Sequence, residues 1–117
     1  MIERFGVGID ITTINRFKKL PYSTNQKFYK KIFQLSEINY CLKFKNSAEH
    51  FAGKFAIKEA VKKSILEDMD FLDIRISHYR FKPKITLLKK RPYKFIASIS
   101  HDDNVAIAIV MSEKTSA

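Results

Sequence analysis

The sequence contains one cysteine, Cys41, and no long run of apolar residues. A single thiol excludes an internal disulfide, and such scarcity fits the reducing cytoplasm. No apolar stretch approaches the roughly 18 residues that a membrane-spanning helix needs, and residues 1–6 lack the apolar core of a secretory signal. We therefore expect a soluble cytoplasmic protein in which Cys41 is a buried, unreactive thiol.

Several motifs of known chemistry are also missing. The sequence has no glycine-rich phosphate-binding loop, no cysteine and histidine cluster at zinc-ligand spacing, and no serine-nucleophile elbow. If the protein binds phosphates or a metal ion, other residue types must therefore supply the contacts.

Acidic residues are absent between Asp10 and Glu37, and the net charge of the whole chain is +10. A charge of this size favours a polyanionic partner, such as nucleic acid, an anionic membrane surface, an acidic protein or a phosphorylated cofactor. The acid-free segment is either a solvated basic face or a docking surface. Its basic residues are Arg16, Lys18, Lys19, Lys27, Lys30 and Lys31.

Hydrophobic periodicity predicts both helices and strands. The chain, residues 1–117, is expected to form a single domain, because its length is near the commonest domain size. Residues 5–11 alternate with the period of a strand. Helices are expected over about 13–20, over parts of 26–44 and over about 47–67. The expected N-caps are Thr12 or Thr13, Ser36, and Asn46 in a capping box with Glu49.

The second half of the chain has the pattern of strands. Residues 72–81 and 84–88 flank Lys82-Pro83 and predict a hairpin, and residues 95–100 and 105–111 flank a turn at 101–104. The last of these segments is apolar on both faces, so we expect it at the centre of a sheet. Helices packed on one antiparallel sheet, an α+β domain, is the economical architecture.

Glu59 is the residue that this pattern singles out. In the predicted helix it projects from the middle of an apolar stripe, and not from a polar flank. A buried carboxylate needs a cation, a network of donors or a metal ion, so Glu59 is either a functional residue or half of a buried salt bridge. The stripe consists of Ala48, Phe51, Ala52, Phe55 and Ala56.

Asp10 lies where the first predicted strand passes into a helix, and it could pair with Glu59. Two carboxylates repel each other unless a cation separates them, and hard oxygen ligands of this kind suit Mg²⁺, which often takes phosphate oxygens as further ligands. Alternatively, Asp10 caps a turn. The combination of two acids with a cation indicates phosphate chemistry.

Basic side chains surround Glu59 in the sequence. Lys54, Lys58 and Lys63 could solvate the helix or bind phosphates as point charges. His101 follows Ser98-Ile99-Ser100 at the end of a predicted strand, where it is either an ordinary turn residue or an imidazole that a loop exposes at a site.

Three segments together resemble the holo-acyl-carrier-protein synthases, the small single-domain type of 4′-phosphopantetheinyl transferase. The first is Gly6-Val7-Gly8-Ile9-Asp10-Ile11 followed by Arg16, the second is Phe51-Ala52-Gly53-Lys54-Phe55-Ala56-Ile57-Lys58-Glu59-Ala60, and the third is Ser98-Ile99-Ser100-His101. They span the chain in the order and at the spacing of that family.

The resemblance implies transfer of 4′-phosphopantetheine from coenzyme A to a serine of apo acyl carrier protein, as in fatty acid biosynthesis, with release of adenosine 3′,5′-bisphosphate. It implies Mg²⁺ on Asp10 and Glu59, catalysis by these two acids with Lys58, and a homotrimer with sites between subunits. Coenzyme A would contact Lys54, Lys63, Ser100 and His101, with Pro83 near the adenine. Arg16, Lys18 and Lys19 would dock the acidic carrier protein.

The chain also departs from the family pattern in three places. After Lys63 the family carries a loop of Gly-Thr-Gly type, whereas residues 64–70 here contain no glycine and three acids. Asp102 replaces a small hydroxylic residue, and the turn before Pro83 lacks a glycine. The loop change bears on coenzyme binding, so a non-catalytic basic scaffold is an alternative.

A nucleic-acid-binding module is the competing class of function. The net charge and the abundant Phe and Tyr residues favour it, because aromatic rings can stack on bases. Asp10 and Glu59 argue against it, because a groove for polyphosphate would exclude acids.

Overall fold

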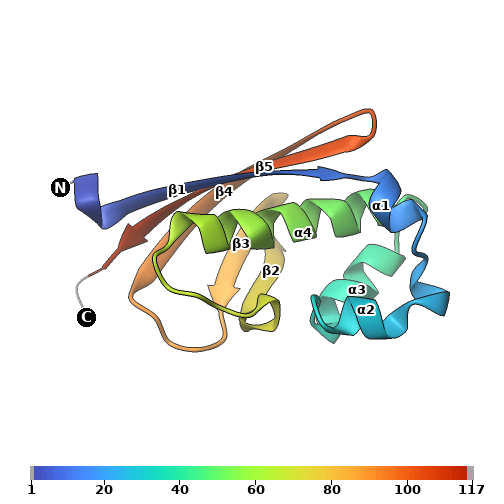
Figure 1. Cartoon of the computed structure of the whole chain (residues 1–117), viewed down its shortest axis with the longest axis horizontal. Coiled ribbons are helices and arrows are strands. Elements are labelled where there is room, and N and C mark those ends of the chain that lie inside the picture. The colour runs from blue at the N-terminus through green and yellow to red at the C-terminus, as the bar shows by residue number, and fades with distance from the viewer. Residues whose placement is uncertain (1, 116–117) are drawn as a thin grey trace.

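The structure is a computed structural model that describes residues 2–115. One long helix, α4 (Ser47–Ser64), packs against a three-stranded antiparallel sheet on one side and contacts a two-stranded hairpin on another (Figure 1). The larger sheet contains β1 (Phe5–Thr13), β5 (Val105–Lys114) and β4 (Tyr93–Asp102) in that order, and the hairpin pairs β2 (Ile74–Tyr79) with β3 (Lys82–Leu87).

The shorter helices gather beside the N-terminal half of α4. They are α1 (Asn15–Lys18), α2 (Gln26–Lys30) and α3 (Leu35–Leu42), with 3₁₀ turns at Ile2–Arg4, Tyr22–Thr24 and Phe71–Asp73. The predicted α+β class is therefore confirmed, and so is the central position of the last strand. The strands form two sheets, however, and not the single sheet that the sequence pattern predicted.

The predicted hairpin is present, but its turn lies elsewhere. Arg80 and Phe81 form the turn, and Lys82-Pro83 begins β3. The turn between β4 and β5 is also shorter than the predicted 101–104, because both strands extend toward it and His101 pairs with Ala106. His101 is therefore a strand residue and does not lie in a loop.

The predicted N-cap of the first helix was wrong. Thr12 and Thr13 both belong to β1, and the Thr12 hydroxyl donates to Asp10 Oδ2 at 2.7 Å instead of capping a helix. Ser36 does not cap α3 either; the backbone N–H of Gln34, the N-cap residue, donates to Glu37 Oε1 at 2.7 Å. The start of α4 at Ser47 was right, although Asn46 makes no side-chain cap hydrogen bond and the helix ends at Ser64, earlier than predicted.

Two glycines let α4 approach β1 closely. A Cβ atom at Gly8 would lie 1.9 Å from the carbonyl oxygen of Ala60, and one at Gly6 would lie 1.8 Å from that of Ser64. Any side chain there would push the helix away from the strand, so the Gly-x-Gly-x-Asp pattern brings the backbone of α4 directly over this face of β1. Asp10, two residues beyond Gly8, shares that face.

Two hydrophobic clusters follow one another along α4. The first lies between its N-terminal half and α1–α3, and it is rich in stacked aromatic rings such as Phe17, Tyr29 and Phe51. Cys41 belongs to this cluster; it is fully buried, and burial raises the pKa of its thiol to about 12. The second cluster is mostly aliphatic and lies between the C-terminal half of α4 and the strands.

The outer face of the three-stranded sheet, away from α4, is apolar and exposed. We call it the outer sheet face. The strand register places Val7 opposite Met111, Ile9 opposite Ile109 and Ile11 opposite Ile107, so these side chains form one continuous surface. Its exposed apolar members are Phe5, Val7, Ile9, Ile11, Ile96, Ile107, Ile109 and Met111. Among residues 2–115, no helix has the length and apolar character needed to cross a membrane.

Candidate active site

Asp10 lies inside β1, opposite Ala108 of β5, and not at the end of the strand as predicted. Its carboxylate is mostly buried and accepts two hydrogen bonds. Lys63 Nζ, from α4, lies 3.2 Å from Oδ1, and the Thr12 hydroxyl donates to Oδ2. The Lys63 ammonium also donates to the carbonyl oxygen of Ile9 at 3.0 Å, so it bridges the backbone and the side chain of this strand.

Glu59 is the half-buried exception in a segment that is otherwise enclosed. Every other residue from Phe51 to Ala60 is buried, because α4 is covered on most of its circumference. The prediction that Glu59 faces the core was therefore wrong. Within residues 2–115 its carboxylate has no hydrogen bond or ion pair, which also removes the alternative that it belongs to a buried salt bridge.

Asp10 and Glu59 flank the same lysine. Lys63 contacts Asp10 directly, and Glu59 lies one helical turn before Lys63 on the same face of α4. The described residues contain no group of three or more His, Cys, Asp or Glu side chains that could hold a metal. A pair of carboxylates is the usual protein contribution to a Mg²⁺ site that takes its other ligands from water and phosphate.

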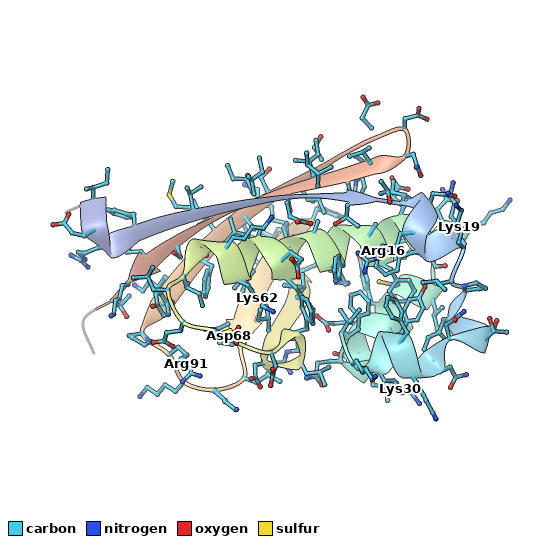
Figure 2. All side chains as sticks on the ribbon, viewed as in Figure 1. Arg16, Lys19, Lys30, Lys62, Asp68 and Arg91 are labelled. Atoms are coloured by element: carbon cyan, nitrogen blue, oxygen red, sulfur yellow. The ribbon has the colours of Figure 1, made fainter. Side chains whose placement is uncertain are left out.

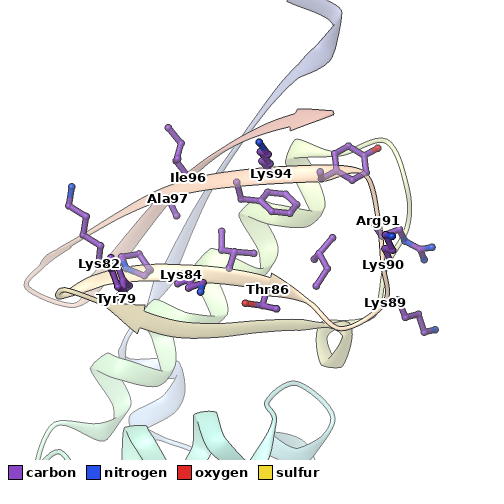
Figure 3. Close-up of a pocket in the computed structure, with 15 residues that line it drawn as sticks. Tyr79, Lys82, Lys84, Thr86, Lys89, Lys90, Arg91, Lys94, Ile96 and Ala97 are labelled. Atoms are coloured by element: carbon purple, nitrogen blue, oxygen red, sulfur yellow. The ribbon is translucent and has the colours of Figure 1, made fainter. Parts of the chain in front are cut away.

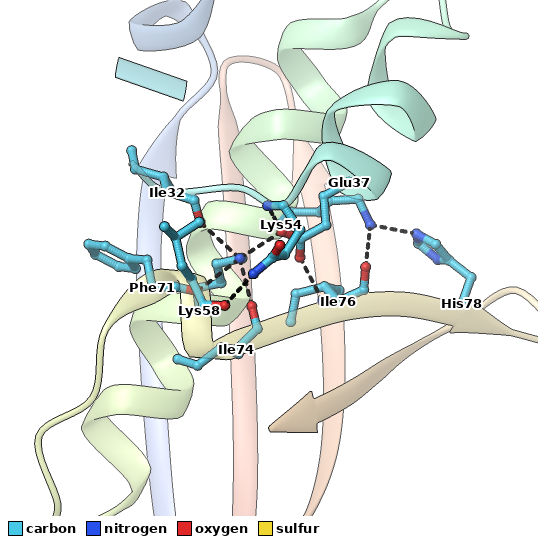
Figure 4. Close-up of polar contacts among 10 residues, drawn as sticks. Ile32, Glu37, Lys54, Lys58, Phe71, Ile74, Ile76 and His78 are labelled. Carbon is cyan, nitrogen blue, oxygen red and sulfur yellow. Dashed lines mark hydrogen bonds and ion pairs between the residues drawn. The ribbon is translucent and has the colours of Figure 1, made fainter. Parts of the chain in front are cut away.

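Lys58 is one of two buried lysines of α4, together with Lys54. Its side chain and that of Glu37 are 0% and 1% exposed, and they form an ion pair at 2.8 Å. Lys58 Nζ also donates to the carbonyl oxygens of Ile32, Phe71 and Ile74 (Figure 4). Burial lowers the pKa of Lys58, and the Glu37 carboxylate opposes this shift. This geometry gives Lys58 a structural role and does not favour the catalytic role that the sequence predicted.

Glu37 completes this network from α3. Its Oε2 accepts the backbone N–H of Ile76 in β2 at 2.7 Å, while Oε1 accepts from Lys58 and from the Gln34 backbone. The pair thus joins α3, the 3₁₀ turn before β2, and β2 itself to the middle of α4. The sequence pattern did not predict a role for Glu37, whose only signal was its place in the first turn of a predicted helix.

A small pocket of about 80 Å³ lies on another side of α4 and brings together three of the predicted coenzyme-binding residues, Lys54, Pro83 and His101. A Cβ atom at Gly53 would lie only 2.7 Å from Ile99 Cδ1, so this glycine lets β4, which carries His101, pack closely against the helix. Other side chains that line the pocket include Tyr40, His50 and His78. The sequence did not predict these three as site residues, because nothing in their spacing indicates that α3, α4 and β2 converge here.

Lys54 is the buried cation of this pocket. Its Nζ donates to the carbonyl oxygen of Ile76 at 3.1 Å, lies 3.0 Å from His78 Nε2 and stands 4.6 Å from the centre of the Tyr40 ring (Figure 4). Burial lowers the pKa of Lys54. Burial, reinforced by the Lys54 charge, lowers the pKa of His78 to about 4, so this imidazole is neutral at pH 7 and can accept a hydrogen bond from the ammonium.

The other two predicted coenzyme contacts do not line this pocket. Lys63 lies at Asp10, as described above. Ser100 is exposed, and the alternation of β4 places it on the outer sheet face, opposite to that of His101. In one chain, therefore, the predicted contacts fall into separate groups.

A groove of about 990 Å³ lies between β3 and β4 (Figure 3). Its lining includes the apolar side chains of Ile85, Leu87 and Phe95, and Pro83 also lines it. Its rim is basic and carries Lys82, Lys84, Lys89, Lys90, Arg91 and Lys94. Of the predicted site residues, Pro83 is the one that lines this groove. Asp10, Glu59 and Lys63 do not line it.

The predicted docking residues lie on and just after α1, as Figure 2 shows for Arg16 and Lys19. All three are exposed. The Arg16 guanidinium lies 4.9 Å from the centre of the Phe55 ring of α4, which orients the side chain through a cation–π contact.

Comparisons with known proteins agree with this arrangement. A sequence profile of the 4′-phosphopantetheinyl transferase superfamily matches residues 6–110. A holo-[acyl-carrier-protein] synthase of Helicobacter pylori is 40% identical over 115 residues, which cover 90% of this chain and 94% of that protein. One from Geotalea daltonii is 32% identical over 127 residues, covering 94% of this chain and 98% of that protein.

Solved structures give the same result. The holo-(acyl-carrier-protein) synthase of Bacillus anthracis in complex with CoA (3′,5′-ADP) superposes with a TM-score of 0.81 at 32% identity, covering 94% of this chain and 96% of that one. The holo-[acyl-carrier-protein] synthase of Helicobacter pylori in complex with coenzyme A superposes with a TM-score of 0.73 at 38% identity, covering 89% of this chain and 96% of that one. The resemblance seen in the sequence is thereby confirmed, and the chain belongs to the 4′-phosphopantetheinyl transferase superfamily, in its holo-[acyl-carrier-protein] synthase family.

Proposed function

We propose that this protein transfers the 4′-phosphopantetheine group of coenzyme A to a serine of an apo acyl carrier protein. The serine oxygen forms a bond to the β-phosphorus, and the bond from that phosphorus to the bridging oxygen breaks. The bridging oxygen leaves with adenosine 3′,5′-bisphosphate. The observation that supports this reaction most directly is the ion pair between Asp10 of β1 and Lys63 of α4, one helical turn from the half-buried Glu59, in a chain that belongs to this family.

Asp10 and Glu59 would hold Mg²⁺, which when bound would neutralise negative charge on the pyrophosphate. Lys63, which pairs with Asp10, is placed to turn toward a phosphate oxygen because its side chain is half exposed. The serine proton passes to Glu59 directly or through a water molecule, a contribution of about 10²–10⁴ in rate. Lys58 takes no part in these steps because its ammonium is enclosed by Glu37 and three carbonyl groups.

Lys54 and His101 would bind a phosphate of the coenzyme, with Pro83 beside its nucleoside. These residues line a pocket on a different side of α4 from Lys63. Lys54 and Lys63 are nine positions apart in α4, which separates them by about 180° around a helix of 3.6 residues per turn. One coenzyme molecule that contacts both groups would therefore bridge two subunits.

This separation supports a homotrimer with active sites between subunits. The outer sheet face offers a surface for the assembly, because its exposed Val, Ile and Met side chains form a continuous apolar patch. Ser100 lies on that face, so it could contact a coenzyme bound at a subunit boundary. The cytoplasm is the proposed location, as expected from the single cysteine.

The acyl carrier protein would dock on α1. Arg16 is exposed and already oriented by the Phe55 ring, and Lys18 and Lys19 extend the positive surface. Exposed guanidinium groups bind carboxylates in a bidentate way, which suits an acidic partner helix. At the α4–β1 contact the nucleic-acid-binding alternative gains no support, because Asp10 and Glu59 would repel a phosphate backbone there.

The metal pair is tested with Glu59→Gln and Asp10→Asn. Both variants should fold and lose at least about a hundredfold in transfer, because an amide keeps the shape but removes the charge that binds a cation. The measurements are the mass of the carrier protein after incubation with coenzyme A, and calorimetric titration with Mg²⁺.

Asp103→Asn is the matched control, because Asp103 is exposed in the β4–β5 turn and asparagine tolerates its φ of 56°. Its transfer rate and Mg²⁺ binding should equal those of the unmodified protein. Normal turnover by Glu59→Gln would remove the metal assignment, and a wild-type protein that leaves the carrier unmodified would refute the proposed function.

A further inference from the structure

The turn between β2 and β3 is strained. Arg80 and Phe81 have φ values of 49° and 69°, the left-handed region that a two-residue hairpin turn requires at both positions. Glycine and asparagine occupy such positions readily, whereas an aromatic side chain is rarely found there. Phe81 therefore holds a place where the backbone alone favours a smaller residue.

No packing of the Phe81 ring within the described residues offsets this strain. It is fully exposed, and among residues 2–115 it stacks on no other aromatic ring. A strained residue with an exposed apolar side chain is unfavourable twice, and such residues gather at binding sites. Phe81 is nevertheless one of the residues that line the Lys54 pocket, at its outer edge.

The pocket itself is suited to a phosphate group and not to a whole nucleotide. Its volume of about 80 Å³ is far below the roughly 300–1,000 Å³ of pockets that enclose a whole small-molecule ligand. Lys54 supplies a positive charge, and His101 supplies a hydrogen-bonding ring. If a phosphate of a nucleotide enters, the sugar and base must remain outside, at the edge where Phe81 and Pro83 lie.

We propose that Phe81 stacks on the purine base of the coenzyme A molecule whose phosphate is bound by Lys54 and His101. The inference rests on the proposed function and names a residue that determines affinity for the nucleotide part of the substrate. A purine has a large flat face, and stacking on an aromatic side chain buries both surfaces without requiring any particular hydrogen bond. The strain at Phe81 is then retained because a glycine could not provide that face.

The test separates stability from binding with three variants. Phe81→Gly should raise the midpoint of thermal unfolding, because it relieves the strain, and should weaken binding of adenosine 3′,5′-bisphosphate about tenfold. Phe81→Leu should weaken binding to a similar extent without the gain in stability, because the strain remains while the aromatic face is lost. Arg80→Gly relieves strain at the neighbouring position and is the matched control, with higher stability and unchanged binding.

Isothermal titration calorimetry measures the affinities, and 4′-phosphopantetheine, which lacks the base, serves as a second ligand that should be indifferent to Phe81. Unchanged affinity for adenosine 3′,5′-bisphosphate in both Phe81 variants, with a wild-type protein that binds it and modifies the carrier, would overturn this inference alone. A wild-type protein that binds neither coenzyme A nor the bisphosphate would overturn the proposed function together with it.

Discussion

Lys58 and Glu37 are each enclosed by the fold, and neither could remain charged there without the other. Removal of one partner from a buried pair leaves an uncompensated charge, whereas replacement of both is far less harmful. Lys58 further satisfies three carbonyl groups, and Glu37 accepts two backbone N–H groups. The pair therefore positions α3 and β2 against the helix that carries Glu59.

We predict that Lys58→Met lowers the free energy of unfolding by about 3–5 kcal/mol. The double variant Lys58→Met/Glu37→Leu should lose less free energy of unfolding than the two single variants lose in sum. Some loss should remain, because the backbone groups bound by the pair lose their partners. Urea denaturation measures all four proteins. Lys58→Met with unchanged stability and abolished transfer would instead restore the catalytic role that the sequence predicted.

The sequence singled out Glu59 as an acid among apolar residues, but it could not predict which groups surround that side chain. An apolar stripe indicates which face of a helix is buried only if the rest of the helix meets water, and α4 is covered on most sides. Under those conditions the stripe does not distinguish Glu59 from Lys58. The partner of Lys58, Glu37, lies 21 positions away in the sequence, and no local pattern predicts such a contact.

At the level of elements, α1 is short but presents its basic residues in a defined way. Phe17 anchors it in the aromatic cluster, and Arg16 rests against the Phe55 ring of α4. An arginine that is already oriented loses less conformational freedom when it binds a carboxylate. This favours α1 over the more scattered lysines of the β3–β4 groove as the anchor for an acidic partner.

We predict that Arg16→Glu raises the KM for the acyl carrier protein by about tenfold or more, equivalent to about 1.4 kcal/mol, and leaves the KM for coenzyme A nearly unchanged. Steady-state kinetics with each substrate varied in turn provides both values. The difference between the proteins should shrink as salt is added, because exposed charges are screened.

Lys90→Glu introduces the same change of sign beside Arg91, far from α1 (Figure 2), and serves as the control. If Arg16→Glu changed the KM for coenzyme A and left the KM for the carrier protein unchanged, α1 would bind the coenzyme and not the carrier.

The strands were easier to predict than the ends of the helices. Alternation of apolar residues depends only on which face is buried, so β1 and the central position of β5 were evident. Helix caps depend on which partner a hydroxyl group finds. Thr12 binds Asp10 rather than a helix N–H, a choice that depends on the fold around it.

For the whole molecule, the arrangement of the two groups around α4 has a direct experimental consequence. If the Asp10 group and the Lys54 pocket of one active site belong to different subunits, then two inactive variants can complement each other. We predict that mixing Glu59→Gln with His101→Ala subunits restores activity, up to about a quarter of the wild-type value for random pairing of two subunit types. The two variants are unfolded and refolded either together or separately, and the amount of modified carrier protein in the two samples measures the restored activity.

Ile9→Lys supplies the corresponding test of the assembly. Ile9 is exposed at the middle of the outer sheet face, so a charge there should leave the subunit folded but disrupt the contact between copies. Sedimentation should then show monomers without activity. An active monomer, or a mixture of variants that regains nothing, would place a complete site within a single chain.

The enclosure of α4 also determines how the proposed catalytic residues respond to thermal fluctuations. Helix ends and loops open and close locally, but the amide groups of a helix surrounded by a sheet, a hairpin and three shorter helices reach solvent only when most of the domain opens. Glu59 and Lys63 are carried by that helix, and Asp10 by the strand that packs directly on it. The two acids therefore keep their positions on α4 and β1 for as long as the domain remains folded.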